Sequence, residues 1–523
     1  MNSRMQLRSL TAGLSGKKGA VITFQRGKIE EHPFPAVAGD VALVRRALAE
    51  WGVRPGMRVG IYAPNSYAWL LHDLALIDIG AISVPFTDDF AGQVNEELLA
   101  RYDVALLLVA KVHAKLFPQK PAHIAFIDAD NDNIRALDRM APTQGDEDDQ
   151  HSLVFSSGSA GGLKGLVISR KGLEATLPPI YKMLDLRAGD RMLLFLPMSN
   201  LQQRNMCYAA LSQDYDIVIT DYTQLFAAMK ALNPTLLIAP PVLYQMIYAE
   251  FEKKPAWQRN LRLGLAKAAS LIPVPAMRRA AIHALFGDVL GQFGTRMRLL
   301  LTGMAPIRRN IGAFFDLLQL PLCESYGMVE AGSITYRGLE SRAFGSVGKV
   351  LDGIKLVFEA DGEIIVERDA HLTLRYFQCV DGENERTFLS PRQVATGDIG
   401  RLDADGNLYL MGRKKELIVA PNGYKIHPEA IEQELNHCPD VEQSVIFLKP
   451  HAANLTCVVV LNQPETEGAR ERVKKYVAGL QSTKKAAQFV DVKFADETFT
   501  RENGMLRPNM KIDRKRITAK YGN

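Results

Sequence analysis

Apolar strands alternate with amphipathic helices in the first part of the chain, and this alternation constrains the fold more than any other feature. Residues 21–25 alternate like a strand, and residues 41–51 carry apolar side chains at helical spacing before Gly52, a residue that commonly ends a helix. Residues 104–110 form a continuous apolar run, typical of a strand buried on both faces. The pattern predicts an α/β fold of mostly parallel sheets covered by helices.

The chain is long enough for more than one domain. At 523 residues it exceeds what one ordinary core accommodates. From residue 345 onward short strands and turns prevail, which indicates a β subdomain. The tail after residue 411 mixes helices and short strands over about 110 residues, enough for a domain of its own. We predict a large domain of parallel-rich sheets plus the β subdomain over residues 1–411, and a small α+β domain over residues 412–523.

Composition excludes several classes of protein. Apolar residues make up 47% and charged residues 23% of the chain, and no apolar run approaches the roughly 20 residues that span a bilayer. A net charge of +5 is weak over this length, and no block of aromatic and basic residues predicts nucleic-acid binding. Five scattered cysteines favour free thiols in the cytoplasm over a zinc site.

One basic and apolar helical region, residues 261–291, is interrupted by Pro273 and Pro275. Such a mixture is compatible with contact to a membrane surface. A core or rim helix is the preferred interpretation, so we expect at most peripheral membrane contact.

The first chemical signal is a loop rich in glycine and hydroxyl groups, LVFSSGSAGGLKGLV, at residues 153–167. Glycines let the backbone approach an anion closely, and hydroxyls with a lysine can complete a phosphate cradle. The candidate phosphate ligands are Ser156, Ser157, Gly158, Ser159 and Lys164. The spacing differs from the nucleotide loop GxxxxGKS/T, because glycine follows the lysine. By composition alone, a flexible surface loop fits equally well.

The loop resembles the phosphate loop of the adenylate-forming superfamily, which includes acyl-CoA synthetases, luciferases and the adenylation domains of peptide synthetases. Other segments resemble this superfamily's motifs in the same order. They include LPMSNLQQR at 196–204, LTGMAP at 301–306, ESYGMVE at 324–330, TGD at 396–398 and GRKKELI at 412–418. The resemblance covers nearly the whole chain, and the motifs are most similar to those of fatty and long-chain acyl-CoA synthetases.

The resemblance implies a nucleotide site. Tyr326 would offer a flat face to adenine, and Gly327 would let the backbone come close. Asp398 would bind the ribose hydroxyls, since a carboxylate can accept two hydrogen bonds from a cis-diol. Arg413 would lie near the nucleotide, and Glu330 is a hard oxygen ligand suited to Mg²⁺. The other residues that the resemblance assigns to the nucleotide are Gly303, Ala305, Pro306, Glu324, Ser325 and Met328.

The resemblance also implies a two-step reaction with ATP, Mg²⁺ and a thiol. Attack of a small carboxylic acid on the α-phosphate gives an acyl adenylate and pyrophosphate, and a thiol then displaces AMP. The thiol belongs to CoA or to the phosphopantetheine arm of an acyl or peptidyl carrier protein, and the sequence is compatible with both. The small domain would be mobile and would pivot at a hinge, Lys415, between the two steps.

Three positions depart from the motifs. Ala160 replaces a threonine of the phosphate loop, Asn200 replaces a histidine that borders the acyl pocket, and Val329 replaces a threonine whose hydroxyl contacts the reacting groups. Losing one such hydrogen bond to a charged oxygen costs about 1.5–3 kcal/mol. A degenerate protein that binds nucleotide or acyl ligand without turnover therefore remains an alternative. Slower, specialised catalysis fits better, because the cationic and carboxylate groups are present.

The adenylation lysine is assigned to Lys511. In the superfamily this lysine usually lies in the motif NGKxxR. This chain reads NGMLRPNMKIDR at residues 503–514, so a methionine occupies the usual lysine position. The run resembles the long-chain synthetase variant NGxLTPTxKxKR, whose lysine lies further on. A solvated basic tail is the alternative interpretation, since Arg514, Lys515 and Arg516 follow closely.

Overall fold

The computed structural model describes residues 6–87, 90, 92–129, 131–140, 149–157, 163–303, 307–339, 341, 343–419, 425–449, 452, 454–462, 465–483, 490–500, 502–506 and 512–522. Within these residues, no helix combines the length and apolar character needed to cross a membrane.

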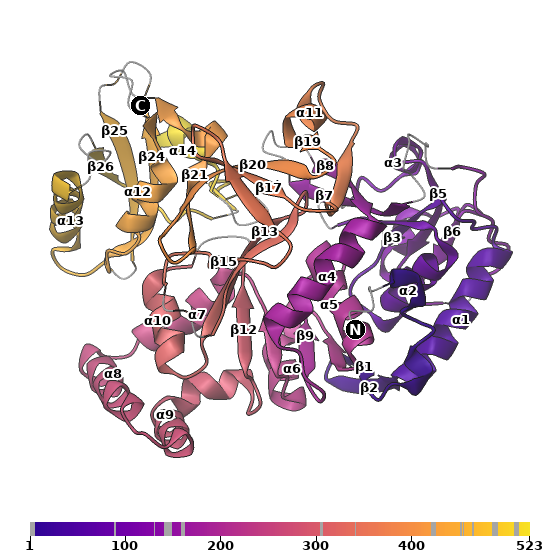
Figure 1. The fold of residues 1–523 in the computed structure, drawn as a ribbon, viewed down its shortest axis with the longest axis horizontal. Helices are drawn as coiled ribbons and strands as arrows, with labels where there is room; N and C mark the ends of the chain where they lie inside the picture. The colour runs from indigo at the N-terminus through magenta and orange to yellow at the C-terminus, as the bar shows by residue number, and fades with distance from the viewer. Residues whose placement is uncertain are drawn as a thin grey trace.

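Two parallel-rich sheets build the large domain (Figure 1). The first has the order β15-β14-β13-β12-β11-β9-β10-β1-β2 and the second β18-β8-β7-β4-β3-β5-β6. The strands of the first are β1 (Ala20–Gln25), β2 (Lys28–Pro33), β9 (Arg191–Leu194), β10 (Asp216–Ile219), β11 (Leu236–Ile238), β12 (Leu299–Thr302), β13 (Leu322–Met328), β14 (Gly332–Arg337) and β15 (Lys349–Val350). Those of the second are β3 (Arg58–Tyr62), β4 (Ile82–Pro85), β5 (Val104–Val109), β6 (Ile124–Phe126), β7 (Gln150–Ser157), β8 (Leu163–Ser169) and β18 (Thr373–Phe377).

Helices connect and cover these strands, as the alternation in the sequence predicts. They are α1 (Phe34–Glu50), α2 (Tyr67–Ile79), α3 (Glu96–Arg101), α4 (Arg170–Leu184), α5 (Leu201–Gln213), α6 (Leu225–Leu232), α7 (Pro241–Glu252), α8 (Ala256–Ser270), α9 (Pro275–Leu290) and α10 (Arg309–Leu317). The apolar run at 104–110 is confirmed as a strand, because every residue of β5 is buried. The helical region at 261–291 is divided at its prolines, and Pro275 occupies the first turn of α9.

The two sheets share one hydrophobic core. A single cluster of buried residues includes Val59 and Leu106 of the second sheet, Met192 and Ile217 of the first, and side chains of α2, α4 and α5. Burial of this continuous apolar surface is the main stabilisation of the large domain.

A buried polar network crosses that core at α5. The Arg204 Nη1 donates to Asp73 Oδ1 at 3.0 Å and to Ser83 Oγ at 2.7 Å, and its Nη2 donates to Ser152 Oγ at 2.9 Å. Arg204 and Asp73 have no exposed side-chain surface. Their pairing fixes α5 against α2, β4 and β7, because leaving either charge unpaired in the interior is costly.

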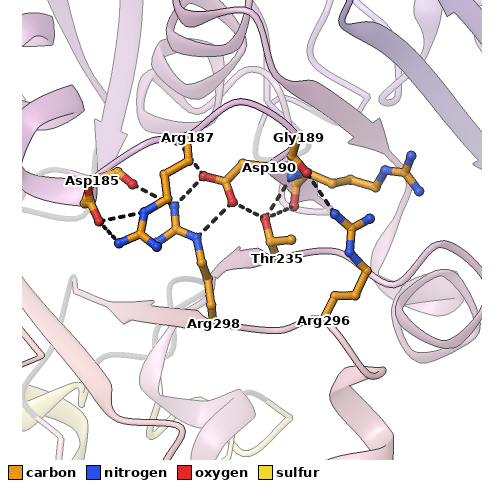
Figure 2. A network of polar contacts seen from close by, with 8 residues as sticks. Asp185, Arg187, Gly189, Asp190, Thr235, Arg296 and Arg298 are labelled. Atoms are coloured by element: carbon orange, nitrogen blue, oxygen red, sulfur yellow. Dashed lines mark hydrogen bonds and ion pairs between the residues drawn. The ribbon is translucent and has the colours of Figure 1, made fainter.

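A second polar network lies where parallel strands of the first sheet begin (Figure 2). Asp190, Thr235 and Arg298 directly precede β9, β11 and β12. Asp190 accepts from the Thr235 hydroxyl at 2.8 Å, from the Arg187 amide at 2.7 Å and from Nε and Nη2 of Arg298, the Nε at 2.8 Å. Arg296 donates to the Gly189 carbonyl at 3.0 Å. The network ties three strand starts together at the amino-terminal edge of the sheet.

The β subdomain and the small domain follow. The subdomain contains β16 (Lys355–Phe358), β17 (Glu363–Glu367), α11 (Glu383–Thr387), β19 (Phe388–Ser390), β20 (Gln393–Leu402) and β21 (Leu408–Arg413). The small domain contains β22 (Ile418–Val419), β23 (Lys425–Ile426), α12 (Pro428–Leu435), β24 (Val441–Leu448), β25 (Leu455–Leu461), α13 (Ala469–Thr483), β26 (Val490–Phe494) and α14 (Arg514–Tyr521), and it has hydrophobic clusters of its own. The boundary that we predict at residues 411 and 412 falls within β21.

Candidate functional site

The sequence motifs gather beyond the carboxyl-terminal ends of the parallel strands. Asn200, Gly303 and Glu330 follow β9, β12 and β13, respectively. In open parallel sheets the loops at these ends form the ligand site. The candidate site therefore lies at the opposite end of the strands from the Asp190 network of Figure 2.

The described residues of the phosphate-loop motif lie on β7 and β8, which pair antiparallel. Ser156 and Ser157 end β7, and Ser156 pairs with Lys164 of β8 across the antiparallel ladder. Five predicted site residues lie outside the described part of the chain, namely Gly158, Ser159, Ala305, Pro306 and Lys511. Ala160 also lies outside it.

Lys164 and Glu330 meet at one tyrosine. The Lys164 ammonium pairs with Glu383 and lies 4.8 Å from the ring centre of Tyr376. The Tyr376 hydroxyl donates to Glu330 Oε1 at 2.9 Å. Burial, and after it the neighbouring Glu330 carboxylate, raise the pKa of Tyr376, so the hydroxyl stays a donor. A cation and a carboxylate from distant motifs are thus held on one aromatic side chain.

Sequence reasoning missed Tyr376 and Glu383. Tyr376 reaches the site because β18 pairs antiparallel with β8, opposite Leu166, and Glu383 follows on α11. The only local signal is the strand-like pattern of Thr373–Phe377. That pattern gives no indication of the partner strand.

Asp398 lies between an aromatic and a cationic group. The Tyr326 hydroxyl donates to Asp398 Oδ2 at 2.8 Å, and Arg413 Nε lies 3.2 Å from Asp398 Oδ1. The hydroxyl of Thr396 accepts from the Asp398 amide at 3.0 Å and orients the turn. Burial and the Asp398 carboxylate raise the pKa of Tyr326 well above its ordinary value.

Each Asp398 oxygen therefore has one partner among the described residues. A carboxylate offers about four lone-pair sites in all, so two remain for a ligand. The side chain of Asp398 is 12% exposed and that of Arg413 is 42% exposed. This arrangement suits the binding of two adjacent hydroxyl groups, the pattern that a ribose presents.

Four further residues of the ESYGMVE motif, Glu324, Ser325, Gly327 and Met328, lie on β13 and contact other parts of the protein. Glu324 pairs with Arg337 in a buried ion pair, with Nη2 and Oε1 2.8 Å apart, and the Ser325 hydroxyl donates to the Thr335 carbonyl at 3.2 Å. A Cβ at Gly327 would lie 2.5 Å from the Gly332 carbonyl oxygen, so only glycine fits there. Met328 packs in the cluster around Tyr326. The Glu324 carboxylate is used within the protein, and only Tyr326 of this group reaches Asp398.

The two departures in the described residues have local roles. The Asn200 side chain accepts from the Gln202 amide at 2.9 Å and caps α5. The Val329 carbonyl accepts from the Thr373 hydroxyl at 2.7 Å, and its side chain packs against the shared core. Val329 thus contributes apolar surface where the superfamily motif carries a hydroxyl.

The hinge motif begins directly after the Asp398 partner. Arg413 ends β21 opposite Asp398 of β20, and Lys415 lies in the short turn Lys414–Glu416 that follows. Lys414 pairs with Glu363 at 2.5 Å and Asp361 at 2.9 Å, both on the large-domain side. At the end of the turn, Glu416 lies 3.1 Å from Arg514 of α14 in the small domain. The connection thus has ionic anchors on both sides of Lys415.

Comparison with known proteins gives consistent matches. A family model described as AMP-binding enzyme matches residues 20–370. The long-chain-fatty-acid–CoA ligase of Mycobacterium tuberculosis is 26% identical over 550 residues, covering 92% of this chain and 90% of the ligase. A chloroplastic long-chain-fatty-acid–acyl-carrier-protein ligase of Arabidopsis thaliana is 20% identical and covers 90% of this chain and 79% of that ligase.

Solved structures agree on the fold. The O-succinylbenzoate coenzyme A synthetase of Bacillus subtilis, in complex with AMP, superposes with a TM-score of 0.72 and covers 98% of each chain. The sequence identity is 18%, so this likeness concerns the fold. The α/β architecture predicted from the sequence, with a large and a smaller domain, is confirmed.

Proposed function

Because the chain belongs to the AMP-binding enzyme family and is an ATP-dependent acid–thiol ligase, we propose that it activates a fatty acid as an acyl adenylate and transfers the acyl group to CoA. The observation that carries the nucleotide assignment is Asp398, whose carboxylate keeps two acceptor sites beside Tyr326 and Arg413. The fatty acid and CoA are supported by the bacterial relative, which matches this chain along nearly its whole length.

In the proposed first step, an oxygen of the substrate carboxylate attacks the α-phosphorus of ATP and pyrophosphate leaves. Asp398 holds the ribose hydroxyls, and the phosphate-loop residues with Lys164 bind the phosphates. Lys511 stabilises the negative charge that develops during transfer. Holding both reactants in line removes much of the entropic cost of their meeting.

Glu330 fits the role of a Mg²⁺ ligand, because the Tyr376 hydroxyl donates to only one of its two oxygens. When bound there, Mg²⁺ would supply charge neutralisation at the phosphates.

In the proposed second step, the thiol sulfur attacks the acyl carbon, the bond to AMP breaks, and the thiol proton is lost. The small domain pivots at Lys415 between the steps, which would bring a different face to the site. We expect the reaction to take place in the cytoplasm.

Two alternatives follow from specific observations. Transfer to the phosphopantetheine thiol of a carrier protein is supported by the Arabidopsis relative. Binding without turnover is supported by Ala160, Asn200 and Val329.

Acid-dependent ATP–pyrophosphate exchange tests the proposal directly. We expect exchange with medium- and long-chain fatty acids, dependent on Mg²⁺, and a loss of at least about a hundredfold in Lys511→Ala. The matched control is Lys515→Ala, an exposed neighbour on α14 that should retain activity. If none of the tested acids supports exchange, the result favours binding without turnover. Full activity of Lys511→Ala would refute the role of Lys511.

The acceptor is tested by adding CoA or a phosphopantetheinylated carrier protein after activation and measuring the thioester by mass. We expect the CoA thioester. A product found only on the carrier protein would overturn the choice of CoA and leave the activation step intact.

A further inference from the structure

Helices α8 and α9 form a peripheral pair that projects at one end of the large domain (Figure 1). Their outward surface is unusually apolar. The large apolar residues exposed on it are Trp257, Leu261, Leu265, Leu271, Val274 and Met277, and Leu271 in the turn between the helices is 82% exposed. Trp257, Leu261 and Leu265 recur every four residues, so they form one stripe along α8.

The same segment is strongly basic, and the one acidic residue of the two helices is Asp288 of α9. Residues 253–287 contain seven lysines and arginines and no aspartate or glutamate. The net charge of the whole chain is only +5, so the rest of the protein is slightly acidic. The basic character is therefore local to this projection.

The inward face of the pair is already satisfied. Arg262 pairs with Asp288 at 2.5 Å and lies 4.6 Å from the ring centre of Phe286, and Lys254 lies 3.1 Å from Asp288. In contrast, Lys267, Arg278 and Arg279 form no ion pair with any residue that the structure describes. Three cations of the pair thus have no ion-pair partner among the described residues, on the same two helices that expose the apolar side chains.

We propose that the α8–α9 pair docks on the surface of an anionic lipid bilayer. Large apolar residues insert at the boundary of headgroups and acyl chains, tryptophan is suited to that depth, and lysine and arginine pair with lipid phosphates. The exposed surface is a projecting ridge, and a bilayer can deform around a ridge. A protein partner would need a groove of matching shape.

This inference is independent of the proposed chemistry. For a fatty-acid ligase, docking adds access to a substrate that dissolves in bilayers. It adds a role to the helices that the sequence predicts to be core or rim helices, because one face of the pair packs in a hydrophobic core through Ile282 and Phe286 while the other face exposes large apolar residues.

Vesicle flotation with the full-length protein tests the proposal, using phosphatidylcholine vesicles with and without phosphatidylglycerol. We expect binding to the anionic vesicles, weakened by high salt. The double variant Lys267→Glu/Arg279→Glu should bind more than about tenfold more weakly, since each basic residue near such a surface contributes substantially. Leu271→Ser should also weaken binding, because it removes an exposed apolar anchor.

The matched controls are Lys115→Glu and Val112→Ser, which change an exposed cation and an exposed apolar residue far from α8 in the sequence. They should bind as the unchanged protein does. Pyrophosphate exchange in detergent-free solution should be the same in all variants, which separates docking from catalysis. Equal binding of the ridge variants and their controls, or no binding to anionic vesicles, would overturn the proposal. So would ridge variants that lose binding to an acidic carrier protein while vesicle binding is unchanged.

Discussion

Two buried aspartates, Asp190 at the amino-terminal edge of the first sheet and Asp398 on β20 of the β subdomain, use their carboxylates in different ways. Asp190, at the amino-terminal edge, receives four hydrogen bonds, two on each oxygen, and its side chain is 4% exposed. Asp398, which lies beside Tyr326 of β13, has one partner on each oxygen among the described residues, and the side chain of its arginine is 42% exposed. A carboxylate with all its acceptor sites used can only hold the fold together, whereas one with two sites left can also bind a ligand.

The largest expected effect comes from removing the site carboxylate. Asp398→Ala should lower kcat/KM for ATP by about a hundredfold or more, because two hydrogen bonds to a charged group, each of about 1.5–3 kcal/mol, are lost. The free energy of unfolding should fall less than in Asp190→Ala, since only the buried Tyr326 hydroxyl loses its acceptor in the interior and the Arg413 side chain is 42% exposed. Pyrophosphate exchange and denaturant unfolding measure the two quantities. Asp405→Ala, in the turn of the same hairpin, is the control. A loss below tenfold would remove Asp398 from the nucleotide site.

The reverse pattern is expected at Asp190. Asp190→Ala leaves Arg298, the Thr235 hydroxyl and the Arg187 amide without their acceptor, so we expect the free energy of unfolding to fall by about 3 kcal/mol. Activity at low temperature should persist, because the network is remote from the site. Unfolding in urea together with exchange at low temperature tests this. A variant as stable as the unchanged protein but inactive would contradict the comparison.

Tyr326→Phe would sharpen the comparison by taking away one donor of Asp398. Since a single hydrogen bond contributes about 0.5–1.5 kcal/mol, we expect a loss of roughly 2- to 12-fold in kcat/KM for ATP. The control is Tyr215→Phe, whose buried hydroxyl donates to the Met206 carbonyl instead. Equal effects of the two variants on kcat/KM would mean that the Tyr326 hydroxyl acts only through stability.

The smallest expected effect is a dependence of stability on pH. Burial opposes ionisation of Asp190, but the donors from Arg298, Arg187 and Thr235 outweigh it and hold its pKa below the ordinary 3.8. Because the folded pKa is lowered, the stabilisation is complete above that ordinary value and is lost as the pH falls below it. Urea unfolding below pH 5 should therefore show a shallower acid dependence in Asp190→Asn. An unchanged slope would show that Asp190 contributes nothing to acid sensitivity.

Features encoded by local patterns were predictable from the sequence. The buried strand β5, the division of α8 from α9 at prolines and the α/β class all follow from short stretches of sequence. In each case the signal lies within the element itself.

Partners brought together by strand pairing were not predictable. Tyr376 joins Lys164 to Glu330 only because β18 pairs with a distant strand. Glu324 was assigned to the nucleotide from its motif, and its buried partner Arg337 lies on the neighbouring strand β14. Single-sequence patterns do not encode which strands become neighbours, so the use of a carboxylate inside the protein is visible only in three dimensions.

The core shared by the two sheets also affects how the chain is made. Its members extend from Leu7 to Tyr376, so the core is incomplete until β18 has been synthesised and has paired with β8. During synthesis on the ribosome, the early strands and the apolar surfaces of α2 and α5 therefore stay partly exposed until β18 is available. Exposed apolar surfaces of this kind favour aggregation. We therefore expect this domain to depend on chaperones during synthesis more than a protein whose halves each close their own core.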